Sequence, residues 1–159
     1  MTPIIRQATL EDAPALAGLY RAQMEEQVAG SEPGPRLSDS ATTWECQAAC
    51  LARLIVDPDA LVMVAVGPAG DLVGYELAAL AWAPDPFEVT RALRSISTYI
   101  VPEHRKGRLA DRLVKDALAW GRAAGCEWAE CRTNVGSTAQ TLLYRGGFDV
   151  VGVEMRMKL

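Results

Sequence analysis

The sequence predicts an α/β fold in which helices flank a mixed central sheet. Segments with helical and strand periodicity follow one another in the order strand, two helices, three strands, helix, strand, helix, strand, and this alternation is typical of layered α/β domains. The chain of 159 residues lies within the usual range of one domain, and half of its residues are apolar, which supports a substantial core. No internal repeat or low-complexity segment divides it. Residues 1–159 are therefore expected to form a single domain.

The first half of the chain is expected to contain one strand, two helices and a strand hairpin. Thr9 precedes Glu11 and Asp12, which predicts a helix with a threonine cap and acidic residues at its positive end. A second amphipathic helix follows a segment rich in glycine and proline and ends before Pro58. The expected elements are a strand at 4–8, helices at 9–27 and 39–56, and strands at 61–66 and 72–82.

The second half is expected to alternate strands with helices. Its first strand ends at Pro102, and its side chains are predicted to alternate between two faces. These faces are Ile96, Thr98 and Ile100 against Ser95, Ser97 and Tyr99. The expected elements are a strand at 94–101, a helix at 109–124, a strand at 127–133, a helix at 137–146 and a strand at 148–158.

Charge and hydropathy limit the class of partner. A net charge of −4 argues against nucleic-acid binding through a broad basic face, because such binding rests on many phosphate contacts. No window approaches the ~20 apolar residues of a membrane span, and the first residues lack the basic segment and apolar run of a secretory signal. These features predict a cytoplasmic protein with no membrane partner.

The histidine and cysteine content argues against a metal site. His104 is the only histidine, and the four cysteines have no zinc-like spacing to it. We therefore expect no metal and reduced thiols. Cys131 is an alternative nucleophile, but His104 lies on a different loop, and a cysteine in a strand is usually a small core residue.

A turn with three basic residues, Arg105, Lys106 and Arg108, separates a strand from the long helix. The unpaired amides and partial positive charge of a helix N-terminus make it an anion site. Cations at this end are disfavoured by the helix dipole, and a bound anion would offset that cost. Gly107 has no side chain to obstruct a phosphate. A solvated basic turn explains the same residues, so the turn alone does not decide between these two interpretations.

Three stretches, in the correct order, resemble the GCN5-related N-acetyltransferase (GNAT) family. Residues 99–110, followed by Leu113, are similar to its motif A, in which an Arg/Gln-x-x-Gly-x-Gly/Ala loop surrounds the pyrophosphate of acetyl-CoA. Residues 5–9 with Asp12 resemble the usual opening of the family. Residues 143–148 resemble its Leu-Tyr-x-x-x-Gly-Phe signature, with one residue fewer between tyrosine and Gly-Phe. The order of elements also matches that fold.

The resemblance implies a mostly antiparallel mixed sheet and an enzyme that moves an acetyl group from acetyl-CoA to a primary amine of a small molecule or peptide. The amine would attack the thioester directly, with backbone amides at Thr98 to Ile100 polarising its carbonyl. Tyr144 matches the family tyrosine that protonates the departing thiolate, a role suited to a phenol. Homodimers are common in the family. The residues implied to bind acetyl-CoA are Thr98, Tyr99, Ile100, Arg105, Lys106, Gly107, Arg108, Leu109, Ala110, Asp111 and Asn134.

The chain departs from the family pattern at two positions. Arg108 stands where motif A usually has glycine, so this arginine is itself a candidate to reach a phosphate. The strand position that often has a glutamate base falls near Arg94 or Ser95, neither of which can play that part. The acids left as proton acceptors, through a water chain, are Glu76, Glu88 and Glu130. Each of them also fits an ordinary solvated surface position.

Two other functions use the same residues. A catalytically silent acyl-CoA-binding regulatory module would tolerate the altered glycine pattern and the missing base, although the intact Tyr144 argues against it. An interaction subunit whose basic turn binds nucleic-acid phosphate is disfavoured by the net charge and by the lack of aromatic residues within that turn.

Overall fold

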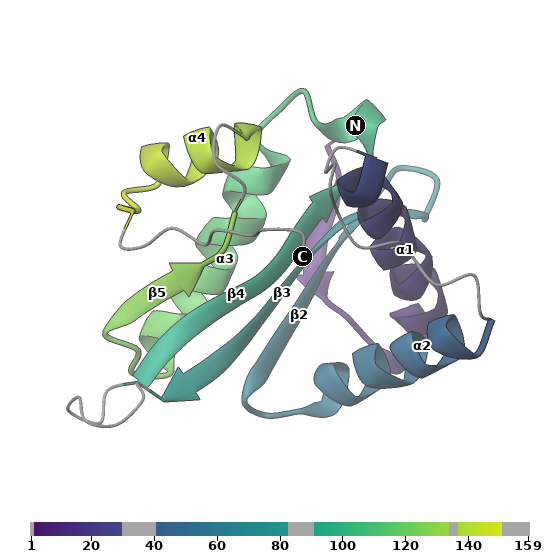
Figure 1. The fold of residues 1–159 in the computed structure, drawn as a ribbon, viewed down its shortest axis with the longest axis horizontal. Helices are drawn as coiled ribbons and strands as arrows, with labels where there is room; N and C mark the ends of the chain where they lie inside the picture. Colours follow the sequence, from purple (N-terminus) through teal and green to yellow (C-terminus); the bar gives the residue numbers. More distant parts are fainter. Residues whose placement is uncertain (1, 30–40, 83–90, 134–136, 151–159) are drawn as a thin grey trace, which may run out of the picture.

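One mixed sheet organises the protein, and helices cover both of its faces (Figure 1). The computed structural model describes residues 2–29, 41–82, 91–133 and 137–150. Within them, five strands follow one another in the spatial order β1-β2-β3-β4-β5. The first four pair antiparallel and β4 pairs parallel with β5, which confirms the expected α/β class and the mostly antiparallel sheet.

The bounds of the elements lie close to those expected from the sequence. The strands are β1 (Ile4–Gln7), β2 (Ala60–Val66), β3 (Leu72–Trp82), β4 (Arg91–Ile100) and β5 (Trp128–Cys131). The helices are α1 (Ala13–Ala29), α2 (Ala41–Val56), α3 (Leu109–Ala123) and α4 (Thr138–Arg145), with short 3₁₀ turns at Leu10–Asp12 and Pro102–His104. The largest difference is that Thr9 begins the first 3₁₀ turn, whereas α1 itself begins at Ala13.

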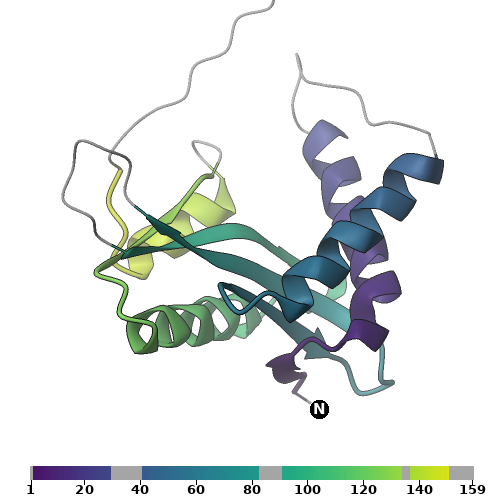
Figure 2. The same ribbon diagram turned by 90° about the horizontal axis from the view of Figure 1, so that it is seen from below.

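The helices form two layers. Figure 2 shows α1 and α2 on one side of the sheet and α3 on the other, with α4 opposite α3. Leu16, Leu51 and Tyr75 join α1 and α2 to their face of the sheet, and each is completely buried. On the other face, Leu113 and Ala117 of α3 belong to two separate apolar clusters. The core therefore lies on both faces of β2, β3 and β4.

A bulge in β4 changes the predicted face of one residue. The register moves from Leu77 opposite Ser97 to Ala78 opposite Ser95, which leaves Ile96 as the extra residue. The expected alternation between two faces is therefore wrong at this point. Ser95 lies on the same face as Thr98, and the hydroxyls of both residues bind one carboxylate from β3.

The end of the chain leaves one expected element untested. Residues 148–150 are not a strand, and the rest of the strand expected at 148–158 lies outside the described residues. None of the helices in the described part of the chain combines the length and apolarity of a membrane span.

Candidate functional site

The site begins where β4 and β5 separate. Their pairing ends at Ser95 opposite Cys131, and β4 continues to Ile100 without a strand partner on this edge among the described residues. The carbonyl oxygens of Thr98 and Ile100 accept from side chains: Gln23 Nε2 at 3.3 Å and Arg105 Nε at 2.8 Å. The two strands thus form a fork, and the main-chain polar groups on the open edge of its β4 arm have no strand partner among the described residues.

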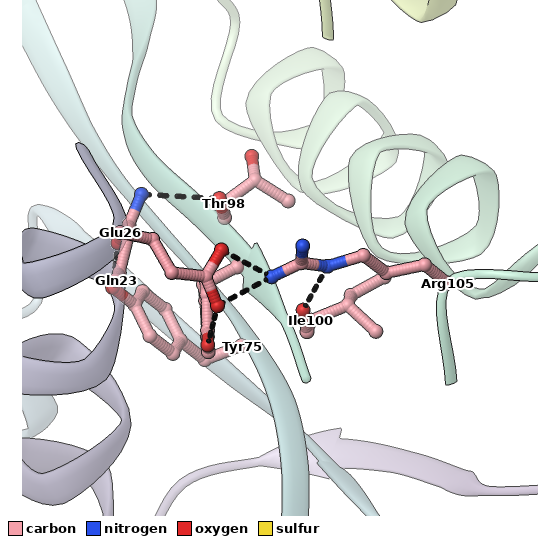
Figure 3. A network of polar contacts seen from close by, with 7 residues as sticks. Gln23, Glu26, Tyr75, Thr98, Ile100 and Arg105 are labelled. Atoms are coloured by element: carbon pink, nitrogen blue, oxygen red, sulfur yellow. Dashed lines mark hydrogen bonds and ion pairs between the residues drawn. The ribbon is translucent and has the colours of Figure 1, made fainter. Parts of the chain in front are cut away.

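Arg105 fastens the end of β4 to α1 (Figure 3). Its Nη2 lies 2.8 and 2.6 Å from the two carboxylate oxygens of Glu26, and its guanidinium carbon lies 5.4 Å from the centre of the Tyr99 ring. Tyr99 Oη donates to the same carboxylate at 2.7 Å. The hydrogen bond from Tyr99 lowers the pKa of Glu26, and the Arg105 guanidinium lowers it further. Burial and the contact with Glu26 raise the pKa of Tyr99 to about 12. The Arg105 guanidinium therefore binds other residues of the protein.

Gln23 of α1 forms a second set of hydrogen bonds to the sheet, and sequence reasoning missed it. Its side-chain oxygen accepts from Tyr75 Oη and, at 2.7 Å, from Ser97 Oγ. Burial raises the pKa of Tyr75 and keeps its phenol protonated. The available signal was that Gln23 lies seven residues after Leu16, on the apolar stripe of α1, where a polar residue needs a partner.

The basic turn connects the end of β4 to α3 and stands open to solvent. Lys106, Gly107 and Arg108 are exposed, and an added side chain at Gly107 would meet no atom within 4 Å. Arg108 is the N-cap of α3 and its side chain makes no capping hydrogen bond, so the first-turn amides keep their capacity for an anion. A hollow of about 360 Å³ lies at this turn. It is lined by Thr2, Pro3, Glu103, His104, Lys106, Gly107, Arg108, Leu109 and Arg112.

The next three predicted residues form the first turn of α3. Leu109 is buried in the cluster with Ile100, so it offers only its backbone to the turn. Ala110 and Asp111 are half-buried. Because α3 begins at Leu109, the amides of all three residues belong to the uncapped N-terminus.

Tyr144 lies in α4, whose start follows the predicted capping pattern. Ser137 Oγ accepts from the Gln140 backbone N–H at 3.1 Å. Gln140 Nε2 in turn donates to Tyr144 Oη at 3.1 Å, and the Tyr144 side chain is half-exposed. Asn134 lies outside the described residues. The hydroxyl of Tyr144 is therefore oriented by its own helix and accessible from solvent.

Glu76 overturns the expectation of a surface acid. It is completely buried in β3, where its carboxylate accepts from Ser95 Oγ at 2.6 Å and from Thr98 Oγ1. Burial raises the pKa of Glu76 to about 7, against the lowering effect of these two hydrogen bonds. Glu130 is half-exposed and pairs with Arg94 at 2.6 Å, and Glu88 lies outside the described residues.

Comparisons with solved structures assign the fold. No protein-family model and no curated protein matches the sequence. The structure is similar to that of a tetramutant of a protein from Bacillus halodurans, with TM-score 0.84, 16% identity and coverage of 98% of this chain and 99% of that one. It is also similar to a predicted acetyltransferase with acetyl-CoA from Clostridium acetobutylicum, with TM-score 0.78, 11% identity and coverage of 98% and 96%. A third similar structure is glucosamine-6-phosphate N-acetyltransferase from Arabidopsis thaliana, with TM-score 0.73, 13% identity and coverage of 99% of both chains.

The chain has the GNAT fold. Within this fold, Arg105 contacts Tyr99 and the carbonyl of Ile100 at the fork, whereas the carbonyl of Thr98 binds Gln23. The exposed part of the basic turn follows directly along the chain. Tyr144 lies on α4, on the other side of the sheet from α3.

Cys131, the alternative nucleophile, is poorly suited to that role in the folded chain. Burial raises the pKa of Cys131, and the nearby Glu76 and Glu130 raise it further, which disfavours the thiolate a nucleophile needs.

Across residues 2–29, 41–82, 91–133 and 137–150, no three histidine, cysteine, aspartate or glutamate side chains gather to hold a metal ion.

Proposed function

We propose that this protein is an acetyl-CoA-dependent N-acetyltransferase that acetylates a primary amine of a small molecule or peptide. One observation supports this most strongly: on the edge away from β3, the end of β4 has no strand partner among the described residues, and it leads through the basic turn into the uncapped N-terminus of α3. An extended chain ending in a pyrophosphate needs this combination of main-chain partners and anion site. The proposal includes a single cytoplasmic domain over residues 1–159 with no nucleic-acid or membrane partner. A homodimer is compatible with it, and the oligomeric state is left open.

The residues at the site fit the cosubstrate. The backbone of Thr98 to Ile100 would pair with the pantetheine arm, and the amides of Leu109, Ala110 and Asp111 would receive the pyrophosphate. Lys106 and Arg108 are exposed at the same end of α3 and would add charge-assisted hydrogen bonds. Arg105 would contribute by holding the end of β4 in place. Asn134 is proposed as a further hydrogen-bonding partner of the CoA arm.

The reaction would be a direct attack of the amine on the thioester. Backbone amides at the fork would polarise the carbonyl, and Tyr144 would donate a proton to the sulfur as the carbon–sulfur bond breaks. No covalent intermediate on the enzyme is needed. The half-exposed Tyr144 hydroxyl, held by Gln140, is accessible for this role.

Calorimetric titration with acetyl-CoA tests the binding part of the proposal. The double variant Lys106→Ser/Arg108→Ser is expected to bind about tenfold to a hundredfold more weakly, because two charge-assisted hydrogen bonds to phosphate are lost. The control is Lys115→Ser/Arg122→Ser, which removes the same charge from two exposed residues further along α3. S-acetylpantetheine, which lacks phosphate, should bind the wild type and both variants equally. Absence of acetyl-CoA binding by the wild type would refute the proposed function.

Thiol release on a panel of primary amines tests the role of Tyr144. Tyr144→Phe should lower the turnover number about a hundredfold, since general acid catalysis contributes at least this much, and should leave the affinity for acetyl-CoA within twofold. Tyr20→Phe, on α1, is the control for loss of a phenol. A wild type that binds acetyl-CoA but turns over no amine on a broad panel would instead identify the silent binding module.

A further inference from the structure

Glu76 is a buried acid beside two apolar clusters. On the face of the sheet covered by α3, one apolar cluster contains Leu113 and the other contains Ala117, and Met63, the register partner of Glu76, packs against both. Among the described residues, no cation forms an ion pair with the Glu76 carboxylate. Burying a carboxylate without a cation is costly, so a role for this group is expected.

The position of Glu76 links it to the fork. Its two hydroxyl partners lie on either side of the β4 bulge, and one of them, Ser95, is the last residue of β4 that pairs with β5. Ser95 is only half-buried, whereas Glu76 has no exposed surface. Thr98 is half-buried as well, but Ser95 is the partner that lies where β5 leaves β4, so its hydroxyl connects the buried carboxylate with the opening of the fork.

We propose that Glu76 is the final acceptor of the proton that the attacking amine releases, and that Ser95 relays this proton. The inference rests on the proposed acetyl transfer. As the nitrogen–carbon bond forms, the amine proton moves to Ser95 Oγ, and the serine proton moves along the existing 2.6 Å hydrogen bond to Glu76. The carbon–sulfur bond breaks, and Tyr144 protonates the sulfur. Glu76 then returns its proton to solvent, and Tyr144 regains one from solvent.

The electrostatic surroundings suit a proton acceptor that works near neutral pH. Burial raises the pKa of Glu76 to about 7, so about half of the group is ionised at neutral pH and its carboxylate is a stronger base than that of an ordinary glutamate. The charge of Glu76 acts on Cys131 of β5, as does that of the neighbouring Glu130, and it also acts on Tyr75 of β3. The facing residues of β2 and α3, Met63 among them, are apolar.

The geometry also separates the two proton-transfer groups. Glu76 lies on the α3 side of the sheet with its register partner Met63, and Ser95 binds it there. Tyr144 belongs to α4, which lies on the other side of the sheet (Figure 2). A proton acceptor and a proton donor on opposite sides of the fork can act on the amine and on the sulfur without exchanging protons with each other.

The test is acetyl transfer by the full chain as a function of pH. The wild-type rate should rise with an inflection near pH 7, the pKa of the buried acid. Glu76→Gln should lose this inflection and be slowed about a hundredfold at neutral pH, a typical contribution of general base catalysis. Ser95→Ala should be slowed by a similar factor although Glu76 is intact. Glu130→Gln should keep the wild-type rate and inflection. All variants should bind acetyl-CoA within twofold of the wild type.

Several outcomes would overturn the relay. If Glu76 only braces the bulge, Glu76→Gln will slow the reaction equally at every pH or not at all, because glutamine can keep both hydrogen bonds. A normal rate in Ser95→Ala would exclude the serine step, and loss of the inflection in Glu130→Gln would move the role to Glu130. Glu76→Asp, which restores a carboxylate, should recover the inflection. A wild type without turnover refutes the proposed function instead, so the two failures are distinguishable.

Discussion

Glu76→Gln is expected to be about 3 kcal/mol more stable than the wild type near pH 8 and equally stable near pH 4. The pKa of Glu76 is raised from 4.5 to about 7 in the folded chain, because burial penalises the charged form. Below pH 4.5 the Glu76 carboxyl is protonated in both the folded and the unfolded state, so its ionisation does not change the free energy of unfolding. As pH rises from 4.5 to 7, the unfolded state loses its proton first, and stability falls. Glutamine does not ionise, so the variant avoids this loss.

Urea unfolding at several pH values measures this difference. Other groups titrate in both proteins, so the wild-type curve minus the variant curve isolates Glu76. Glu130→Gln is the control, because its carboxylate is half-exposed and paired with Arg94, and its substitution should change stability by less than about 1 kcal/mol. A difference between Glu76→Gln and the wild type that stays constant from pH 4 to pH 8 would contradict the burial of an ionising carboxylate.

Leu113→Ala is expected to lower the free energy of unfolding by about 3 kcal/mol, within the usual range for a buried leucine. Leu113 is completely buried and packs with Ala65, Val73, Ile100 and Leu109. It therefore joins α3 to β2, β3 and β4, and its removal leaves a cavity beneath the helix whose first turn forms the anion site. Lys115→Ala, two residues along and exposed, should stay within about 0.5 kcal/mol of the wild type. Equal stability of the two variants would show that α3 is not held in this way.

The basic turn shows which features a local sequence pattern can predict and which it cannot. Strand, proline, three cations and helix start are contiguous in the sequence, so their arrangement depends on neighbouring residues and was predictable. The sequence did not predict which of the three basic side chains would pair with an acid of the protein. Arg105 is held by Glu26, 79 residues away along the chain, and only the packing of α1 beside β4 creates that pair.

Glu76 shows the opposite case. A single acid in an apolar strand is consistent with a solvated face, since strand alternation does not say which face is covered. The bulge then places Ser95 and Thr98 on the same face, and α3 covers that face. Both effects depend on strand register and on helix packing, to which residues distant in sequence contribute.

By itself, the sequence determined the order and approximate bounds of the described elements, the mixed sheet and the position of the basic turn, because periodicity, capping and chain-breaking residues act over a few positions. Only the tertiary structure decided which side chains meet at the fork: Gln23 and Glu26 from α1, Arg105 from the turn, and Glu76 from β3. The burial of Glu76, and with it the shift of its pKa toward neutrality, exists only where α3 excludes water from that face of the sheet.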